Sequence, residues 1–215
     1  MDRPILYSYY RSSCSYRVRI ALYHKGIDFE YHPIHLVKDG GEQLKDPYLK
    51  LNPKGEVPFF VDNEVGIAQS MAISLFLEDK YPQKNLLPKD PLKKAHCIQL
   101  CEMINSGIQP IQNLKVLKYL VTDLSLSQEV KPKWAHHWIS EGFDALESFL
   151  EDLSGDFCLG NEFTLADCFL VPQVYNANRF KVDLDKYPHI KKINENCLNL
   201  DAVKKADPAV QPDAE

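Results

Sequence analysis

Short apolar runs alternate with stretches of helical spacing in the first part of the chain, up to about residue 81. Strands are predicted at 5–9, 28–33, 57–62 and 65–68, the last two forming a hairpin that turns near 62–64. Helices are predicted at 13–25, 42–51 and 70–81. This βαβαββα order predicts a sheet whose faces are covered by helices.

A local signal marks one end of each of these three helices. In the first, Cys14, Val18, Ala21 and Leu22 fall on one apolar stripe, and Gly26 stands where a left-handed C-cap is needed. The second stops at Asn52-Pro53, because proline does not continue a helix. Ser70 is the expected N-cap of the third.

The remainder of the chain, from about residue 91, has helical periodicity almost throughout. A long helix from Pro91 is expected to bend or break at 106–110, and another helix is expected at 132–153. Thr164 and Asp167 have capping-box spacing and predict the start of a further helix. A last helical stretch is expected from 187 onward.

Three prolines between Tyr81 and Pro91 predict a linker, since proline ends a helix and fits poorly inside one. We therefore expect an α/β domain at 1–82, a linker at 83–90 and an all-helical domain at 91–215. The length of 215 residues suffices for this arrangement.

Composition narrows the class of protein. Hydrophobic residues make up 45% and charged residues 26%, which is ordinary globular usage, so disorder is expected only in the acidic tail 207–215. A net charge of −5 without a dense basic block argues against a nucleic-acid partner. No secretory signal or membrane-spanning run is evident, which favours a cytoplasmic, non-membrane protein.

The six cysteines contain no C-x-x-C pair and no zinc-ligand spacing, so no metal site is expected. Free thiols are predicted, most of them as small core residues.

The first candidate site is the junction between the first strand and the first helix. Ser12, Ser13, Cys14 and Ser15 lie where the first backbone N–H groups of the helix lack partners and where the helix dipole favours an anion. These side chains can cap the helix, or they can donate hydrogen bonds to a bound thiolate. The residues alone leave both interpretations open.

Two further stretches are candidates for ligand contacts. Pro58 stands at a strand start, and a cis Val57-Pro58 peptide would turn the Val57 backbone outward to pair with an extended peptide ligand. Only about 5–6% of X-Pro bonds are cis, so the residues alone favour trans. At Gln69-Ser70, Ser70 can cap a helix, bind a ligand carboxylate at the same helix start, or do both.

Taken with these stretches, several local motifs resemble the zeta class of cytosolic glutathione transferases over nearly the whole chain. They are Ser12 to Leu22, Lys38-Asp39-Gly40-Gly41, Leu51-Asn52-Pro53, Val57-Pro58, Gln69-Ser70, Gly107 to Leu114 and Asn176 to Leu184. The resemblance implies a thioredoxin-like α/β domain followed by an all-α helical domain, and it makes the cis peptide expected. The sequence departs from the class at Tyr16, at Lys54-Gly55-Glu56 and in a longer stretch at 121–133.

The resemblance also implies roles for individual residues. Ser12 would be the main group stabilising the thiolate of glutathione, assisted by Ser13 and Cys14. Arg179 would pair with a carboxylate of a small-molecule substrate, as a guanidinium fork suits that group. The remaining implied glutathione contacts are Ser15, Tyr16, Arg17, Gln43, the Val57 backbone, Gln69, Ser70, Gln109, Asn113, Leu114 and Lys115.

The activity implied by the resemblance is glutathione-dependent cis–trans isomerisation of maleylacetoacetate to fumarylacetoacetate, a step of tyrosine and phenylalanine breakdown. The thiolate would add reversibly and be regenerated. A side activity toward electrophiles such as α-halo acids, and a homodimer, are implied as well. Two alternatives stay open: a Cys14-based thiol transferase or dehydroascorbate reductase, and a non-catalytic binding protein of the same fold.

Overall fold

The computed structural model describes residues 3–215, which form two compact units. The first unit comprises the chain up to Asn85 together with Asn199–Glu215, and the second comprises Leu86–Leu198.

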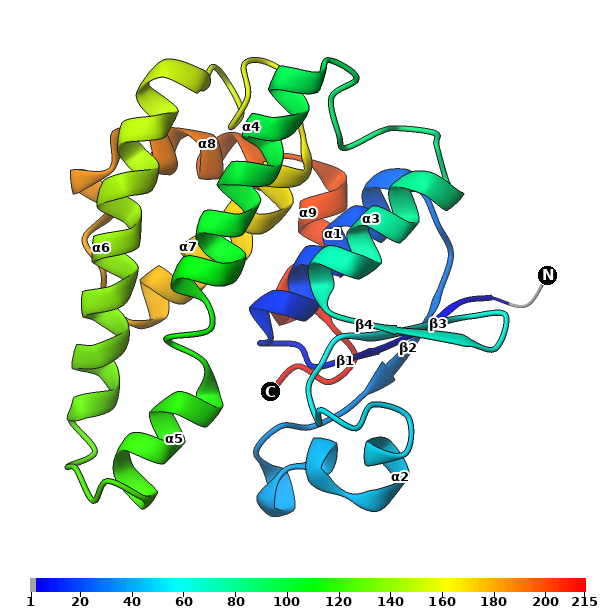
Figure 1. Cartoon of the computed structure of the whole chain (residues 1–215), viewed down its shortest axis with the longest axis vertical. Coiled ribbons are helices and arrows are strands. Elements are labelled where there is room, and N and C mark those ends of the chain that lie inside the picture. Colours follow the sequence, from blue (N-terminus) through cyan, green and yellow to red (C-terminus); the bar gives the residue numbers. More distant parts are fainter. Residues whose placement is uncertain (1–2) are drawn as a thin grey trace. The chain divides into compact units, whose positions relative to one another are not determined.

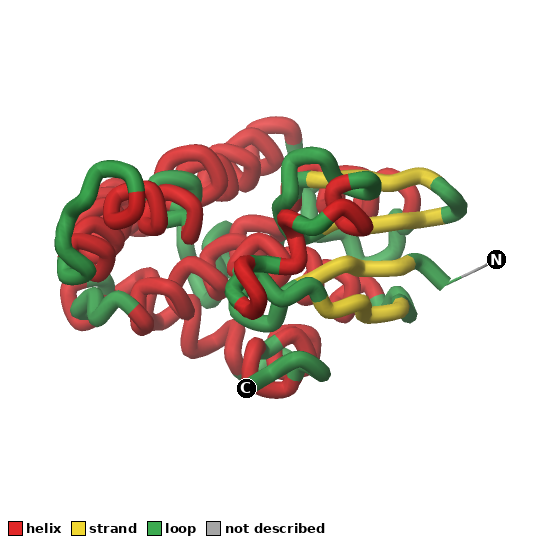
Figure 2. Tube along the Cα trace, turned by 90° about the horizontal axis from the view of Figure 1, so that it is seen from below, coloured by secondary structure: helices red, strands yellow, loops and turns green. Residues whose placement is uncertain are grey.

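A four-stranded mixed sheet forms the centre of the first unit. Its strands are β1 (Ile5–Ser8), β2 (Glu30–Pro33), β3 (Phe59–Asp62) and β4 (Val65–Ala68). They lie side by side in the order β2-β1-β3-β4, with β2 parallel to β1 and the other neighbours antiparallel (Figure 2). This arrangement confirms the predicted βαβαββα order and the thioredoxin-like class.

Helices cover both faces of this sheet (Figure 1). On one face, α1 (Ser13–Lys25) and α3 (Ser70–Lys80) pack over Leu6 and Phe60, which are fully buried. On the other face, Tyr7 and Phe59 pack with Tyr48 of the short helix α2 (Asp46–Leu49). The period-two alternation along β1 and β3 thus builds two apolar layers.

The bounds of α1 agree with the prediction, because both of its ends carry strong signals. Ser12 is the N-cap, and Gly26 adopts the left-handed conformation at φ 71°. At α3 the predicted N-cap was wrong: Ser70 is already helical, and the residue before it, Gln69, occupies the cap position at φ 74°.

The chain between β2 and β3 is more broken than the single predicted helix 42–51. A 3-10 turn at Glu42–Leu44 precedes α2, and Lys45 between them is extended. Strands β1, β2 and β3 are also shorter than predicted, whereas β4 has the predicted bounds. Pro58 has no N–H to give to the ladder, which fits the start of β3 at Phe59 rather than Val57.

The second unit is wholly helical apart from isolated bridges around 154–162. Its helices are α4 (Pro91–Glu102), α5 (Leu114–Thr122), α6 (Val130–Leu153), α7 (Leu165–Arg179) and α8 (Pro188–Leu198). The break expected after α4 is a turn of π-helix at Met103–Ile108. Thr164 and Asp167 form the predicted capping box of α7.

The C-terminal segment differs from its prediction. Residues 199–215 pack with the first unit, through α9 (Asp201–Ala206) against α1, whereas the sequence assigned them to the helical domain. The expected disorder of 207–215 was wrong, because Asp213 accepts hydrogen bonds from Tyr10 N–H and from the Tyr31 hydroxyl. These two bonds anchor an otherwise polar tail.

Candidate functional site

The candidate site begins where the chain leaves β1 and enters α1. Ser12 N–H donates to the Tyr9 carbonyl at 3.0 Å, and the Ser12 carbonyl accepts from Tyr16 N–H at 2.9 Å. The Ser12 hydroxyl oxygen accepts from Ser15 N–H at 3.2 Å. Ser12 therefore acts as a cap and is held at three points.

The Ser12 hydroxyl can cap the helix and still donate a hydrogen bond to an anion. Its oxygen accepts from Ser15, but its own O–H remains a donor. The N–H groups of Ser13 and Cys14 belong to the first turn, where no intrahelical acceptor exists. Ser12 and Cys14 are partly exposed, so this donor cluster faces outward. Helix capping and hydrogen bonding to a bound anion are therefore compatible roles for these serines. The helix dipole adds to the attraction for the anion.

The next three candidates point into the protein instead. The side chains of Ser15, Tyr16 and Arg17 are all but fully buried. The Tyr16 ring lies under the Arg19 guanidinium, with the guanidinium carbon 5.2 Å from the ring centroid. Arg17 Nη1 donates to Ser70 Oγ at 3.1 Å. The structure thus joins two predicted site stretches through a buried arginine.

Gln69 and Ser70 form the start of α3. Gln69 is exposed and holds a φ of 74°, a left-handed conformation that is uncommon for residues other than glycine. Its side chain makes no cap to α3 within the described chain. Backbone N–H groups at this helix start are consequently open to an anionic ligand group, next to the buried Ser70 hydroxyl.

Gln43 carries a buried acceptor atom that lacks a hydrogen-bond partner in the described chain. Its side-chain Nε2 donates to the Leu36 carbonyl at 3.3 Å, while its Oε1 is buried with no hydrogen-bond partner among residues 3–215. Leaving such a group unpaired is costly. Gly41 leaves room for this side chain, since a Cβ there would come within 2.6 Å of it. A peptide N–H of a ligand fits the open acceptor.

Val57 follows Glu56, whose backbone carbonyl is held in a tight turn by two hydrogen bonds. The Glu56 carbonyl accepts from the Tyr48 hydroxyl and from Asn52 Nδ2, each at 2.7 Å. The Val57-Pro58 peptide is cis, as the family resemblance implied. Val57 also belongs to an apolar cluster with Tyr9 and Tyr10, which precede the α1 junction. The Leu51-Asn52-Pro53 motif therefore serves to build this turn.

In the second unit, four candidates follow the π-helical turn. Gln109 is half-buried, and its N–H donates to the Ile104 carbonyl at 2.8 Å. Asn113 caps α5 by accepting from Lys115 N–H at 3.1 Å. The side chains of Leu114 and Lys115 are exposed.

Arg179 lies in the last turn of α7 and is exposed. Its Nη1 donates to Asn176 Oδ1 at 3.4 Å, and its guanidinium lies 5.6 Å from the Phe180 ring centroid. An exposed guanidinium at the end of a helix is suited to binding a carboxylate.

Cys14 differs from the other cysteines. All six are free thiols, as predicted, and Cys14 alone is partly exposed while Cys97, Cys101, Cys158, Cys168 and Cys197 are buried. Cys14 is therefore the thiol that a ligand can reach.

Sequence reasoning missed the residues that hold the site in place. Arg19 is fully buried, and burial lowers the pKa of its guanidinium. Gln112 Nε2 donates to Gln173 Oε1 at 3.3 Å beneath the 109–113 segment. The available sequence signal for such residues was a charged or amide side chain within an apolar stripe. It did not suffice to predict their roles, because their hydrogen-bond partners lie far away in sequence.

Residues 3–215 carry neither a metal-binding cluster of side chains nor a membrane-spanning helix. No cluster of three or more His, Cys, Asp or Glu side chains there is arranged to hold a metal ion. None of the helices in that range is long and apolar enough to cross a membrane.

Comparison with protein families matches residues 6–85 to the N-terminal domain and residues 138–201 to the C-terminal domain of glutathione S-transferase. The chain is 49% identical over 211 residues to maleylacetoacetate isomerase of Mus musculus, covering 98% of this chain and 95% of the relative. It is 46% identical over 210 residues to the zeta-class glutathione S-transferase of Euphorbia esula, covering 97% and 92%.

Solved structures agree with this similarity. A bacterial zeta-class maleylpyruvate isomerase in holo form superposes with a TM-score of 0.94 at 41% identity, covering 98% of this chain and all of that one. Maleylacetoacetate isomerase from Anaeromyxobacter dehalogenans with glutathione bound gives 0.88 at 39% identity, covering 99% and 98%. The similarity therefore spans both units.

Proposed function

The chain belongs to the zeta class of the glutathione S-transferase family, and on that premise we propose that it binds glutathione and isomerises maleylacetoacetate to fumarylacetoacetate. The observation that carries the proposal is the start of α1. There the Ser12 hydroxyl is fixed as a cap by Ser15 N–H yet keeps its own proton to donate.

When bound, glutathione supplies a thiolate that adds reversibly to the conjugated cis double bond, giving a single bond that can rotate. The protein's part is to favour the anion and hold it in place. The Ser12 hydroxyl donates toward the sulfur, and the first N–H groups of α1, from Ser13 and Cys14, add to the positive field.

The peptide and γ-glutamyl parts of glutathione would be held by the other candidates of the first unit. Gln43 Oε1 is an orphaned buried acceptor suited to a peptide N–H. The Val57 backbone offers pairing to an extended peptide. Gln69 and Ser70 present a helix start to the carboxylate, with Ser70 oriented by Arg17.

We assign the substrate contact to Arg179, whose exposed guanidinium is supported by Asn176 and Phe180. Substrate carboxylates would be bound as a bidentate pair. Gln109, Asn113, Leu114 and Lys115 are retained as proposed ligand contacts of the second unit.

A second candidate function rests on Cys14, because it is the one partly exposed cysteine and it lies in the first turn of α1. A thiol there can attack a disulfide, which would give a thiol transferase or dehydroascorbate reductase. We place this behind the isomerase, since the serine on the cap already supplies the donor that a glutathione thiolate needs.

We further propose a homodimer, a reducing cytoplasmic location that keeps the cysteines as thiols, and a side activity toward α-halo acids. Val65 of β4 and Leu75 of α3 are large apolar side chains that stay exposed in the single chain, and a partner subunit would cover them. Sedimentation equilibrium at micromolar protein tests the dimer directly, since a monomeric mass would contradict it.

The enzymatic proposal is tested by incubating the protein with maleylacetoacetate, with and without glutathione, while following fumarylacetoacetate by absorbance. Isomerisation that requires glutathione supports it, and its persistence in Cys14→Ala assigns the nucleophile to glutathione. Failure to isomerise, together with a glutathione adduct at Cys14 seen by intact mass, would favour the thiol transferase.

A further inference from the structure

Asp213, near the C-terminal end of the described chain, binds two elements of the first unit at once. Its Oδ2 accepts from Tyr10 N–H at 3.0 Å, and its Oδ1 accepts from the Tyr31 hydroxyl at 2.6 Å. Tyr10 lies between β1 and Ser12, and Tyr31 lies in β2. Hydrogen bonds to an ionised carboxylate are the stronger kind, so this half-buried residue fixes the junction on one side.

Arg19 fixes the same junction from the other side. Its guanidinium donates to the Tyr9 carbonyl at 3.3 Å and to the Tyr10 carbonyl at 2.9 Å. It also donates from Nε to the Ala206 carbonyl of α9 at 3.0 Å, which ties the C-terminal segment to α1. A fully buried guanidinium with these partners has no freedom to follow a displaced loop.

The contacts of Arg19 and Asp213 meet at the adjacent residues Tyr9 and Tyr10, which lead into Ser12. The Tyr9 carbonyl accepts from Arg19 and also from Ser12 N–H at 3.0 Å. Tyr10, one residue on, is held at its N–H by Asp213 and at its carbonyl by Arg19. The backbone that leads into the Ser12 cap is therefore held both by Arg19 of α1 and by Asp213 of the C-terminal tail.

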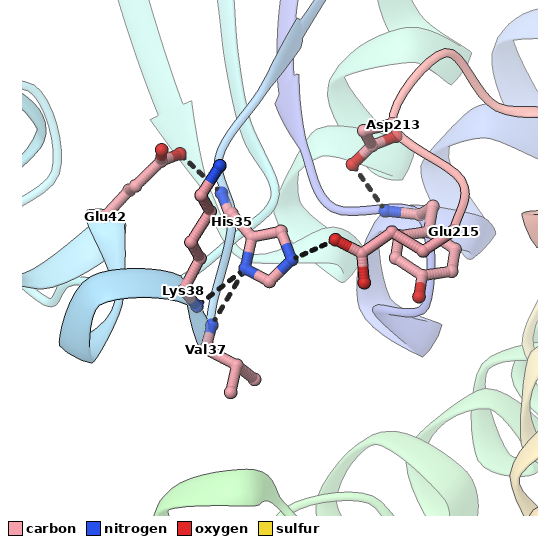
Figure 3. A network of polar contacts seen from close by, with 7 residues as sticks. His35, Val37, Lys38, Glu42, Asp213 and Glu215 are labelled. Atoms are coloured by element: carbon pink, nitrogen blue, oxygen red, sulfur yellow. Dashed lines mark hydrogen bonds and ion pairs between the residues drawn. The ribbon is translucent and has the colours of Figure 1, made fainter.

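A second contact of the tail reaches the loop that precedes Gln43 (Figure 3). His35 Nδ1 accepts from the N–H groups of Val37 at 3.2 Å and Lys38 at 2.8 Å, so this nitrogen carries no proton. The other nitrogen, Nε2, then donates to Glu215 Oε1 at 3.2 Å. Glu215 is largely exposed, so solvent screens this contact and Asp213 is the stronger of the two.

We propose that Asp213 is a positioning residue for the glutathione chemistry: through Tyr10 it sets the place of the Ser12 hydroxyl, with the Glu215–His35 contact as a weaker aid on the second loop. The inference rests on the proposed function, since it assigns Ser12 the role of thiolate donor. Asp213 touches neither the thiol nor the substrate. It acts on them only through the junction.

The test compares Asp213→Asn with Asp207→Asn. Asp207 lies in the same tail and accepts from Ala209 N–H at 2.8 Å, so the control removes a carboxylate that caps a turn but contacts neither Tyr10 nor Tyr31. Three quantities are measured for each variant and for the unsubstituted protein: melting temperature, kcat/KM for glutathione, and the pH at which bound glutathione ionises, from thiolate absorbance.

For Asp213→Asn we expect kcat/KM for glutathione to fall about tenfold to a hundredfold, because a small displacement of a catalytic group suffices for such a loss. The ionisation of bound glutathione should shift to higher pH. Asp207→Asn should show a similar or smaller change in melting temperature with neither kinetic nor ionisation effect. Equal kinetic and ionisation values in the two variants would overturn the inference.

Tyr31→Phe keeps the test decisive if Asp213→Asn does not fold. It removes only the hydroxyl that orients Asp213 and should produce the same ionisation shift at smaller size, while an unchanged ionisation would again overturn the inference. If the unsubstituted protein itself neither bound glutathione nor isomerised the substrate, the proposed function would fail instead. The two failures are therefore distinguishable.

Discussion

Arg17 Nη1 donates to Ser70 Oγ at 3.1 Å, and this buried bond links α1, just after its first turn, to the first residue of α3. Each of these helix starts is a candidate anion site. A guanidinium between them holds both in one arrangement and adds positive charge to each. The position of the α3 start relative to α1 is thereby fixed by a buried hydrogen bond.

Ser70→Ala should therefore raise the Kd for glutathione about tenfold and lower the unfolding free energy by about 1–3 kcal/mol, because a buried donor loses its acceptor. Ser74→Ala is the matched control. Ser74 is buried one turn along the same helix, and its hydroxyl donates to the Ser70 carbonyl at 2.8 Å. Calorimetric titration should give normal glutathione binding for Ser74→Ala, and equal losses in both variants would contradict the assignment.

Gly41→Ala should weaken glutathione binding through Gln43. A Cβ at Gly41 would meet the Gln43 amide at 2.6 Å, whereas one at Gly40 would meet nothing within 4 Å. Both glycines have positive φ, so both variants carry a backbone cost of about 1–3 kcal/mol. Only Gly41→Ala should raise the KM for glutathione severalfold, measured in initial-rate assays. A comparable KM for Gly40→Ala would remove Gln43 from the site.

Ser12→Ala separates capping from chemistry. Loss of the cap should cost about 1 kcal/mol of stability, and loss of the hydroxyl donor should lower kcat about 100-fold. Asp90→Ala provides the control, since Asp90 caps α4 by accepting from Lys93 N–H at 2.9 Å. It should destabilise by a similar amount with unchanged turnover. Near-normal turnover in Ser12→Ala would contradict the proposed role of this serine as hydrogen-bond donor to the thiolate.

The fall of the unfolding free energy at alkaline pH should depend on Tyr31. Burial, and then the hydrogen bond to Asp213, raise the pKa of its phenol above the ordinary value of about 10. Stability from a group with a raised folded pKa is present below the unfolded pKa and is lost as pH rises toward the folded one. Between the unfolded and the folded pKa of Tyr31, ionisation of this phenol should lower the unfolding free energy by about 1.4 kcal/mol per pH unit.

Urea denaturation at a series of pH values above about 9 measures that slope. Tyr31→Phe lacks the phenol, so its curve should be shallower by the same amount, although it starts from a lower stability at neutral pH. A parallel pair of curves would mean that Tyr31 is not the group responsible.

Local signals predicted much of this fold. The bounds of α1 followed from Ser12 and Gly26, and the break after α4 followed from the Ser106–Pro110 stretch, because each is a choice between conformations of neighbouring residues. The α1 junction was proposed as a candidate site for the same reason. Hydroxyls at a helix start have a local meaning in any sequence.

What the sequence could not predict depends on distant partners. Nothing in Gln69 signals a left-handed φ, so Ser70 was taken as the cap. The 207–215 tail has the composition of a disordered end, and only Tyr10 and Tyr31 give Asp213 a place to bind. Arg19 likewise binds backbone carbonyls, which leave no trace in the side-chain pattern.

The central claim is that glutathione acts as a catalyst and is not consumed. The direct measurement supplies maleylacetoacetate in at least about hundredfold excess over glutathione, and quantifies fumarylacetoacetate and free glutathione at completion. We expect complete isomerisation with the glutathione concentration unchanged, because the thiolate leaves after rotation. Conversion that stops at one product per glutathione, with the thiol lost to a stable adduct or disulfide, would contradict it.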